Sequence, residues 1–129
     1  MASIFTRIIQ GEIPCHKVAE NDRFLAFLDI SPLREGHTLV VPKLEVDRFF
    51  DLPAGLMAEI MPFAQEVATK IRKTVPCDRV GVAVIGLEVP HAHVHLIPID
   101  RMADMDFTRE KLKLTQAELA AIAERIRQA

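Results

Sequence analysis

The feature that most limits how this chain can fold is a long amphipathic segment between residues 56 and 75. Its apolar side chains recur at the spacing of one helix face: Leu56, Ile60, Phe63, Val67, Ile71 and Val75. Such a stripe must be covered by another layer, so the pattern predicts a long central helix lying on a sheet. Because proline cannot donate the intrahelical hydrogen bond, we expect a kink or the start of a second helix at Pro62.

Short apolar runs bounded by turn residues supply the expected sheet. They lie at residues 17–19, 23–30, 37–42, 80–85 and 91–99. Their β-branched and aromatic content is typical of strands. The last two runs are joined by about five residues that include Gly86, which indicates an antiparallel hairpin.

The two ends of the chain are expected to be helical. Residues 4–9 indicate a short turn of helix, and Thr115 followed by Glu118 matches a capping box at the start of a C-terminal helix. We therefore predict an α+β fold with a mainly antiparallel sheet of about five strands, one long central helix and a C-terminal helix, with the helices packed to one side. The 129 residues suit a single domain, residues 1–129, with a core at 4–99 and a C-terminal helical extension from about 104 to 129.

Charge and hydropathy exclude several function classes. A charged fraction of 26% with a formal charge of −2 and scattered basic residues does not predict binding to a DNA or RNA duplex or to a membrane surface. No signal peptide or run of 18 apolar residues is present, so we expect a soluble cytoplasmic protein. Cys15 and Cys77 are expected to be reduced thiols.

Three of the five histidines fall within five residues, at His91, His93 and His95. They alternate with Ala92 and Val94, and a strand directs alternate side chains to the same face. The alternation therefore predicts three imidazoles on one side of a strand, with the middle one flanked by the other two.

Two kinds of chemistry suit this cluster. Imidazoles are common metal ligands, and a His-x-His pair with His37 as a third ligand is one possibility. Three ligands from one flat strand are less suitable, since each nitrogen must lie about 2.0–2.1 Å from a zinc ion. The other possibility is nucleophilic attack on phosphorus by a neutral histidine whose opposite ring nitrogen donates its proton to a fixed acceptor.

The motif around the triad is His-φ-His-φ-His-φ-φ, where φ is apolar, and it is met by residues 91–97. Residues 8–14, 25–32 and 36–43 are similar, in the same order, to other signature segments found with this motif. With these four segments, the sequence resembles the histidine triad (HIT) family of nucleotide hydrolases and transferases. The resemblance covers most of residues 4–99.

The resemblance implies catalytic roles for four histidines. His93 would be the nucleophile that takes a nucleoside monophosphate from the α-phosphorus of a phosphoramidate or a dinucleoside polyphosphate. His91 would orient His93 through its backbone carbonyl, and His95 would contact the phosphate. His37 would be packed beside the triad as support.

The resemblance also implies a substrate site and an assembly. Asp29 would accept hydrogen bonds from the ribose hydroxyls, and Phe27 and Ile30 would line an apolar pocket for a purine base. A lone carboxylate in an apolar strand calls for hydrogen-bond donors, which agrees with this role, and a turn cap is the alternative for Asp29. From the residues alone, Phe27 and Ile30 suit core packing at least as well. The family further implies a homodimer with a sheet that continues across the interface. We expect no cofactor.

Two stretches depart from the pattern of the family. Residues 86–90 lack the polar residues that bind phosphate and leaving group in common members, and they place Glu88 near the expected phosphate. Glu88 would be a protonated general acid, or point away, or recognise a cationic leaving group. Ser3 and Thr6 stand where some bacterial members have a Cys-x-x-Cys zinc site, so we expect no structural metal there. The remaining alternatives are a nucleotide-binding or interaction protein of this fold with little turnover, and a metal-dependent hydrolase that uses the histidine cluster.

Overall fold

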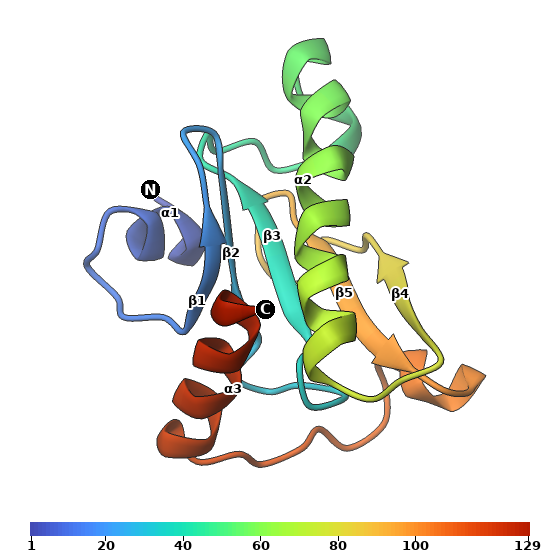
Figure 1. Cartoon of the computed structure of the whole chain (residues 1–129). Helices are drawn as coiled ribbons and strands as arrows, with labels where there is room; N and C mark the ends of the chain where they lie inside the picture. Colours follow the sequence, from blue (N-terminus) through green and yellow to red (C-terminus); the bar gives the residue numbers. More distant parts are fainter.

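The computed structural model describes all 129 residues and is built on one antiparallel sheet (Figure 1). Its neighbouring strands run in the order β1-β2-β3-β5-β4, and every adjacent pair is antiparallel. The strands are β1 (Lys17–Glu20), β2 (Phe24–Leu28), β3 (Thr38–Pro42), β4 (Arg79–Ala83) and β5 (Val94–Ile99). The predicted α+β class, five-stranded sheet and antiparallel pairing of the last two strands are confirmed, but the connection between them, residues 84–93, is longer than the expected five residues.

Two helices cover one face of this sheet (Figure 1). The long helix α2 (Ala54–Thr74) buries Ile60, Val67 and Ile71 of the predicted stripe. The C-terminal helix α3 (Gln116–Gln128) packs beside β1 and β2. Its capping box is confirmed: the Thr115 hydroxyl accepts from the amide of Glu118, and the Glu118 carboxylate accepts from the amide of Thr115.

Helix α2 continues through Pro62, so the prediction of a second helix starting there is wrong. The carbonyl of Ala58 is the one that loses its intrahelical donor to this proline. Both residues lie on the exposed side of α2. Water can therefore satisfy that carbonyl, and the helix need not end.

The opposite face of the sheet carries a smaller apolar cluster and the short helix α1 (Ile4–Ile9). Phe5 of α1 packs there with Leu25 and Phe27 of β2 and with Leu39 and Val41 of β3. These strands are apolar on both faces, so both faces must be covered. The prediction that all helices lie on one side is therefore wrong for α1.

The chain between β5 and α3 is mostly irregular. It contains the short 3-10 helix η2 (Met102–Met105), and a similar turn, η1 (Phe49–Asp51), precedes α2. The C-terminal extension predicted from about residue 104 is thus regularly helical only from Gln116 onwards. None of the helices combines the length and the apolar character needed to cross a bilayer.

Candidate active site

The four histidines singled out by the sequence come together on the face of the sheet opposite α2. His95 lies in β5, directly across from Leu39 of β3, and His37 precedes β3. His91 and His93 lie just before β5, which begins at Val94, so the predicted strand at 91–99 starts three residues later than expected. All four imidazoles are buried.

His93 is held in one orientation by the backbone. Its Nδ1 lies 2.7 Å from the carbonyl oxygen of His91. A carbonyl oxygen can only accept, so Nδ1 carries the proton of the neutral ring and Nε2 has a free lone pair. This is the arrangement that nucleophilic attack by His93 requires.

His91 itself is anchored at both ring nitrogens. Its Nε2–H donates to the carbonyl oxygen of Pro42 at 2.8 Å, which leaves Nδ1 to accept from the Ser3 hydroxyl at 2.7 Å. Ser3 and Thr6 are joined to the end of β3 through Glu45, whose carboxylate accepts from the Ser3 amide and the Thr6 hydroxyl. The two positions where the sequence predicted no metal therefore hold a hydrogen-bond network that fixes His91.

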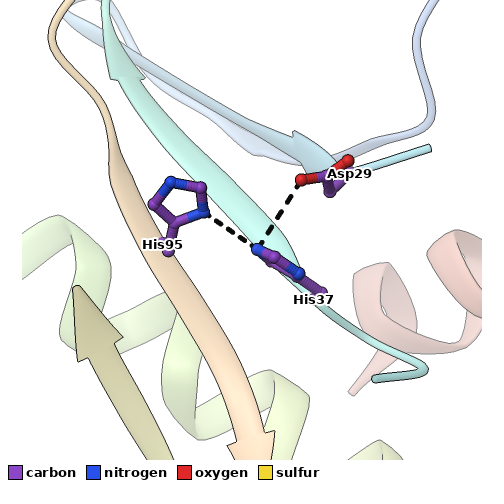
Figure 2. A group of neighbouring side chains, drawn as sticks. All are labelled: Asp29, His37 and His95. Atoms are coloured by element: carbon purple, nitrogen blue, oxygen red, sulfur yellow. Dashed lines mark hydrogen bonds and ion pairs between the residues drawn. The ribbon is translucent and has the colours of Figure 1, made fainter. Parts of the chain in front are cut away.

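His37 and His95 form a directional pair. The amide of Leu33 donates to His37 Nδ1 at 3.0 Å, so the proton of the His37 ring is on Nε2. That Nε2–H donates to His95 Nδ1 at 2.9 Å, the contact drawn in Figure 2. The proton of His95 is consequently on Nε2, as a donor for an anionic group. His95 and His93 thus have opposite tautomers, and their ring centroids are 4.9 Å apart.

Burial keeps this pair neutral. It lowers the pKa of His37 from 6.5 to about 3, helped by the positive charges that His95, Lys111 and His93 would contribute. Burial also lowers the pKa of His95 to about 4, with a smaller effect from His93. Near neutral pH His95 is therefore a neutral hydrogen-bond donor.

Asp29 lies just after β2, at the edge of the same cluster (Figure 2). One carboxylate oxygen accepts from the amide of Ser31 at 2.9 Å, which is the turn-cap contact, and the other lies 3.7 Å from His37 Nε2. Burial raises the pKa of Asp29, while the Ser31 amide acts in the opposite direction. The second oxygen can still accept a hydrogen bond.

Asp29, His37 and His95 are also the group that could hold a metal ion, since one ligand atom from each lies within 4.8 Å of the others (Figure 2). The hydrogen bonds do not favour this use. The Leu33 amide occupies His37 Nδ1, so the proton is on Nε2, where the ion would have to bind. The arrangement suits a chain of hydrogen bonds better than a metal centre.

The other three predicted site residues differ in exposure. Phe27 is buried and packs edge-on against Phe5, whose ring centroid is 5.0 Å from that of His93. Ile30 is 63% exposed and lies outside the apolar cluster. Glu88 is exposed on the loop before the triad and is close enough to Asp29 to raise its pKa.

Several residues of the site were missed by the sequence reasoning. Ser3 and Glu45 contact or support His91, Phe5 packs on His93, and Phe107 packs on His95. Ser3 and Phe5 reach the site through α1, and Phe107 reaches it from a segment without regular structure. No local pattern marks such contacts, because they join residues far apart in the chain.

Comparison with known proteins gives a consistent result. A family model of the HIT domain matches residues 10–102. An uncharacterised HIT-like protein of Helicobacter pylori is 39% identical over 102 residues, which are 77% of this chain and 98% of that protein. The adenosine 5'-monophosphoramidase of Saccharomyces cerevisiae is 38% identical over 75% of this chain and 62% of its own length.

A solved structure extends the similarity to nearly the whole chain. A HIT-like protein of Bartonella henselae, described as involved in cell-cycle regulation, superposes with a TM-score of 0.84 at 28% identity. The match covers 98% of this chain and 95% of that one.

The low pKa values of His37 and His95 predict acid sensitivity. Above pH 6.5 the two rings are neutral in the folded and the unfolded chain. Between pH 6.5 and about 4 the unfolded chain binds protons that the folded chain does not, so the free energy of unfolding falls as pH falls. Each ring contributes up to about 1.4 kcal/mol per pH unit, and this contribution levels off below the folded pKa.

The measurement is urea unfolding of the wild type and His95→Asn from pH 7 to pH 4. In this window the free energy of unfolding of the wild type should fall more steeply with falling pH than that of His95→Asn. The difference in slope should correspond to the uptake of up to one proton on unfolding. Asp104, whose folded pKa is about 2, is present in both proteins and therefore affects both curves alike. Parallel curves would contradict a neutral, buried His95.

Proposed function

The chain belongs to the histidine triad (HIT) family, and on that premise we propose that it transfers a nucleoside monophosphate group from a nucleotide substrate to water or another acceptor through a covalent bond to His93. The observation that carries the proposal is the hydrogen bond from His93 Nδ1–H to the carbonyl of His91, which leaves Nε2 free for attack. The names of relatives support the class, since the yeast protein is an adenosine 5'-monophosphoramidase.

In the first step, the lone pair of His93 Nε2 attacks the α-phosphorus. An N–P bond forms, and the bond from phosphorus to the nitrogen or oxygen of the leaving group breaks. The leaving group departs with that electron pair and takes up a proton from solvent. His95 Nε2–H donates to a phosphate oxygen during this step and so stabilises the developing charge.

In the second step, water attacks the same phosphorus. The new P–O bond releases the nucleoside monophosphate, the N–P bond breaks, and the water proton is lost to solvent. The His93 lone pair is thereby restored, and the carbonyl of His91 keeps the ring in place throughout. Asp29 accepts from the ribose hydroxyls, and Phe27 forms part of the apolar wall on which a purine base packs, with Ile30 at its open edge.

Glu88 favours a particular leaving group. Its carboxylate is exposed on the loop before the triad and close enough to Asp29 to raise the pKa of that carboxyl, so we place two acidic groups beside the bound substrate. Acidic groups repel a second phosphate and attract an amine. We therefore favour a phosphoramidate with a cationic leaving group over a dinucleoside polyphosphate as the substrate.

The test is turnover of an adenosine 5'-phosphoramidate of an alkyl diamine, with and without chelator. We expect hydrolysis by the wild type that chelator does not change. His93→Ala should lower kcat by about 10³-fold or more, because the nucleophile is absent. Mass spectrometry of the acid-quenched wild type should detect one added nucleotidyl group.

His16→Ala is the matched control, since His16 lies outside the cluster and contacts Gln116. It should retain wild-type activity. Binding of nucleotide without turnover by the wild type would instead support a binding protein, and activity lost with chelator would support a metal-dependent hydrolase. Faster turnover of diadenosine polyphosphate than of the phosphoramidate would contradict the assigned role of Glu88.

We also propose that two copies of the chain pair through β4. This strand forms one edge of the sheet and exposes Val82, while Val84 and Ile85 just after it are also exposed. An apolar groove of about 450 Å³ lies beside it, between β4 and Met61 and Ala68 of α2. An exposed apolar edge of this kind favours pairing with another strand.

Sedimentation equilibrium tests the dimer. The wild type should have twice the 14.5 kDa mass of the chain at micromolar concentration. Val82→Glu should be monomeric, because it buries a charge at the interface, whereas Leu44→Glu, at an equally exposed apolar position, should remain a dimer. A monomeric wild type would contradict this pairing.

A further inference from the structure

The segment between β5 and α3 passes over the His37–His95 pair. Phe107 of this segment lies edge-on to both rings, with its centroid 4.9 Å from that of His95 and 6.3 Å from that of His37. The match to the HIT domain ends at residue 102, so Phe107 lies beyond the region that the family model describes. The family match therefore does not account for the contact of Phe107 with the His37 and His95 rings.

Asp104 fixes the start of the segment. It is 3% exposed and accepts from the amides of Asp100 and Arg101 and from the guanidinium groups of Arg34 and Arg109. These hydrogen bonds, led by the Asp100 amide, lower the pKa of Asp104 to about 2. A buried carboxylate with four donors holds its surroundings in one arrangement.

Two further contacts attach the segment to the loop that precedes His37. The Arg109 guanidinium donates to the carbonyl of Leu33, and the amide of Leu112 donates to the carbonyl of Pro32 at 2.9 Å. Leu33 is also the residue whose amide sets the tautomer of His37. Phe107 is thus held on both sides by contacts to the loop that orients the histidine pair.

We propose that Phe107 is a positioning residue that seals the His37–His95 pair from water and so keeps His95 Nε2–H directed at the substrate phosphate. The catalytic part of this inference rests on the proposed function. Water that reached the pair would compete for the single hydrogen bond from His37 Nε2 to His95 Nδ1. His95 could then rotate or change tautomer, and its donor would no longer face the phosphate.

The titratable groups around the pair are consistent with a closed cover. Asp29 faces His37 from just after β2, His93 faces His95 from just before β5, and Lys111 comes from the covering segment. The Lys111 ammonium donates to the carbonyls of Phe107 and Arg109, which ties it to the same segment. Lys111 lowers the pKa of both Asp29 and His37, so the cover also brings a cation to the edge of the site.

The test measures solvent exchange of the His37 Nε2–H proton by NMR, together with kinetics on the adenosine 5'-phosphoramidate. In the wild type this imidazole proton should be observed and should exchange slowly. Phe107→Ala should exchange it at least tenfold faster and lower kcat by tenfold or more with KM changed by less than threefold. Phe107→Leu, which keeps an apolar side chain of similar reach, should restore most of both properties.

Phe50→Ala is the matched control, because Phe50 is 88% exposed and lies outside the site. It should match the wild type in both measurements. The exchange measurement needs no substrate. Faster exchange in Phe107→Ala therefore supports the seal even if the wild type turns over no nucleotide. Absence of turnover by the wild type would contradict only the proposed function. Unchanged exchange in Phe107→Ala, or faster exchange with wild-type kcat in an active enzyme, would overturn the proposal. If the alanine variant does not fold, Phe107→Val, whose shorter side chain also opens the cover, is judged by the same two outcomes.

Discussion

The site depends on one backbone hydrogen bond, from His93 Nδ1 to the carbonyl oxygen of His91. Because a carbonyl has no proton to give, this contact selects the tautomer of His93 without any charged partner. The His91 carbonyl is in turn held by the side chain of His91, which is bonded to Pro42 and Ser3. The first histidine of the triad therefore acts as an anchor, the second as a nucleophile, and their different roles follow from what each ring contacts.

The two faces of the sheet differ: one packs in the main core, and the other carries the candidate site. One face of β2, β3 and β5 packs against α2 and α3 in the main core, which contains Val40, Val94 and Leu96. The other face carries the histidines and the smaller cluster around Phe5. Alternation along each strand makes this possible, since neighbouring residues such as Val94 and His95 point to opposite faces. The core can thus be fully apolar while a polar network occupies the other side.

Much of this arrangement was predictable from the sequence because it is encoded locally. The helical stripe of α2, the Thr115–Glu118 capping box and the five apolar runs each depend on residues close together in the chain. The convergence of His37 with the triad came from resemblance to the family, and the structure places them in contact. The anchors around His91 and the contacts of Phe107 could not be predicted, since they depend on tertiary contacts. The continuation of α2 through Pro62 could not be predicted either, because the exposure of Ala58 is a tertiary property.

The most direct measurement of the central claim is the tautomeric state of each histidine, read from long-range ¹H–¹⁵N correlations of the uniformly labelled protein near neutral pH. The structure predicts that His93 carries its proton on Nδ1, while His37, His91 and His95 carry theirs on Nε2. The expected spectrum contains one histidine with its proton on Nδ1. The signals of that ring should disappear in His93→Ala, which assigns them to His93. Finding the His93 proton on Nε2 would contradict it, because the nucleophilic lone pair would then face the backbone.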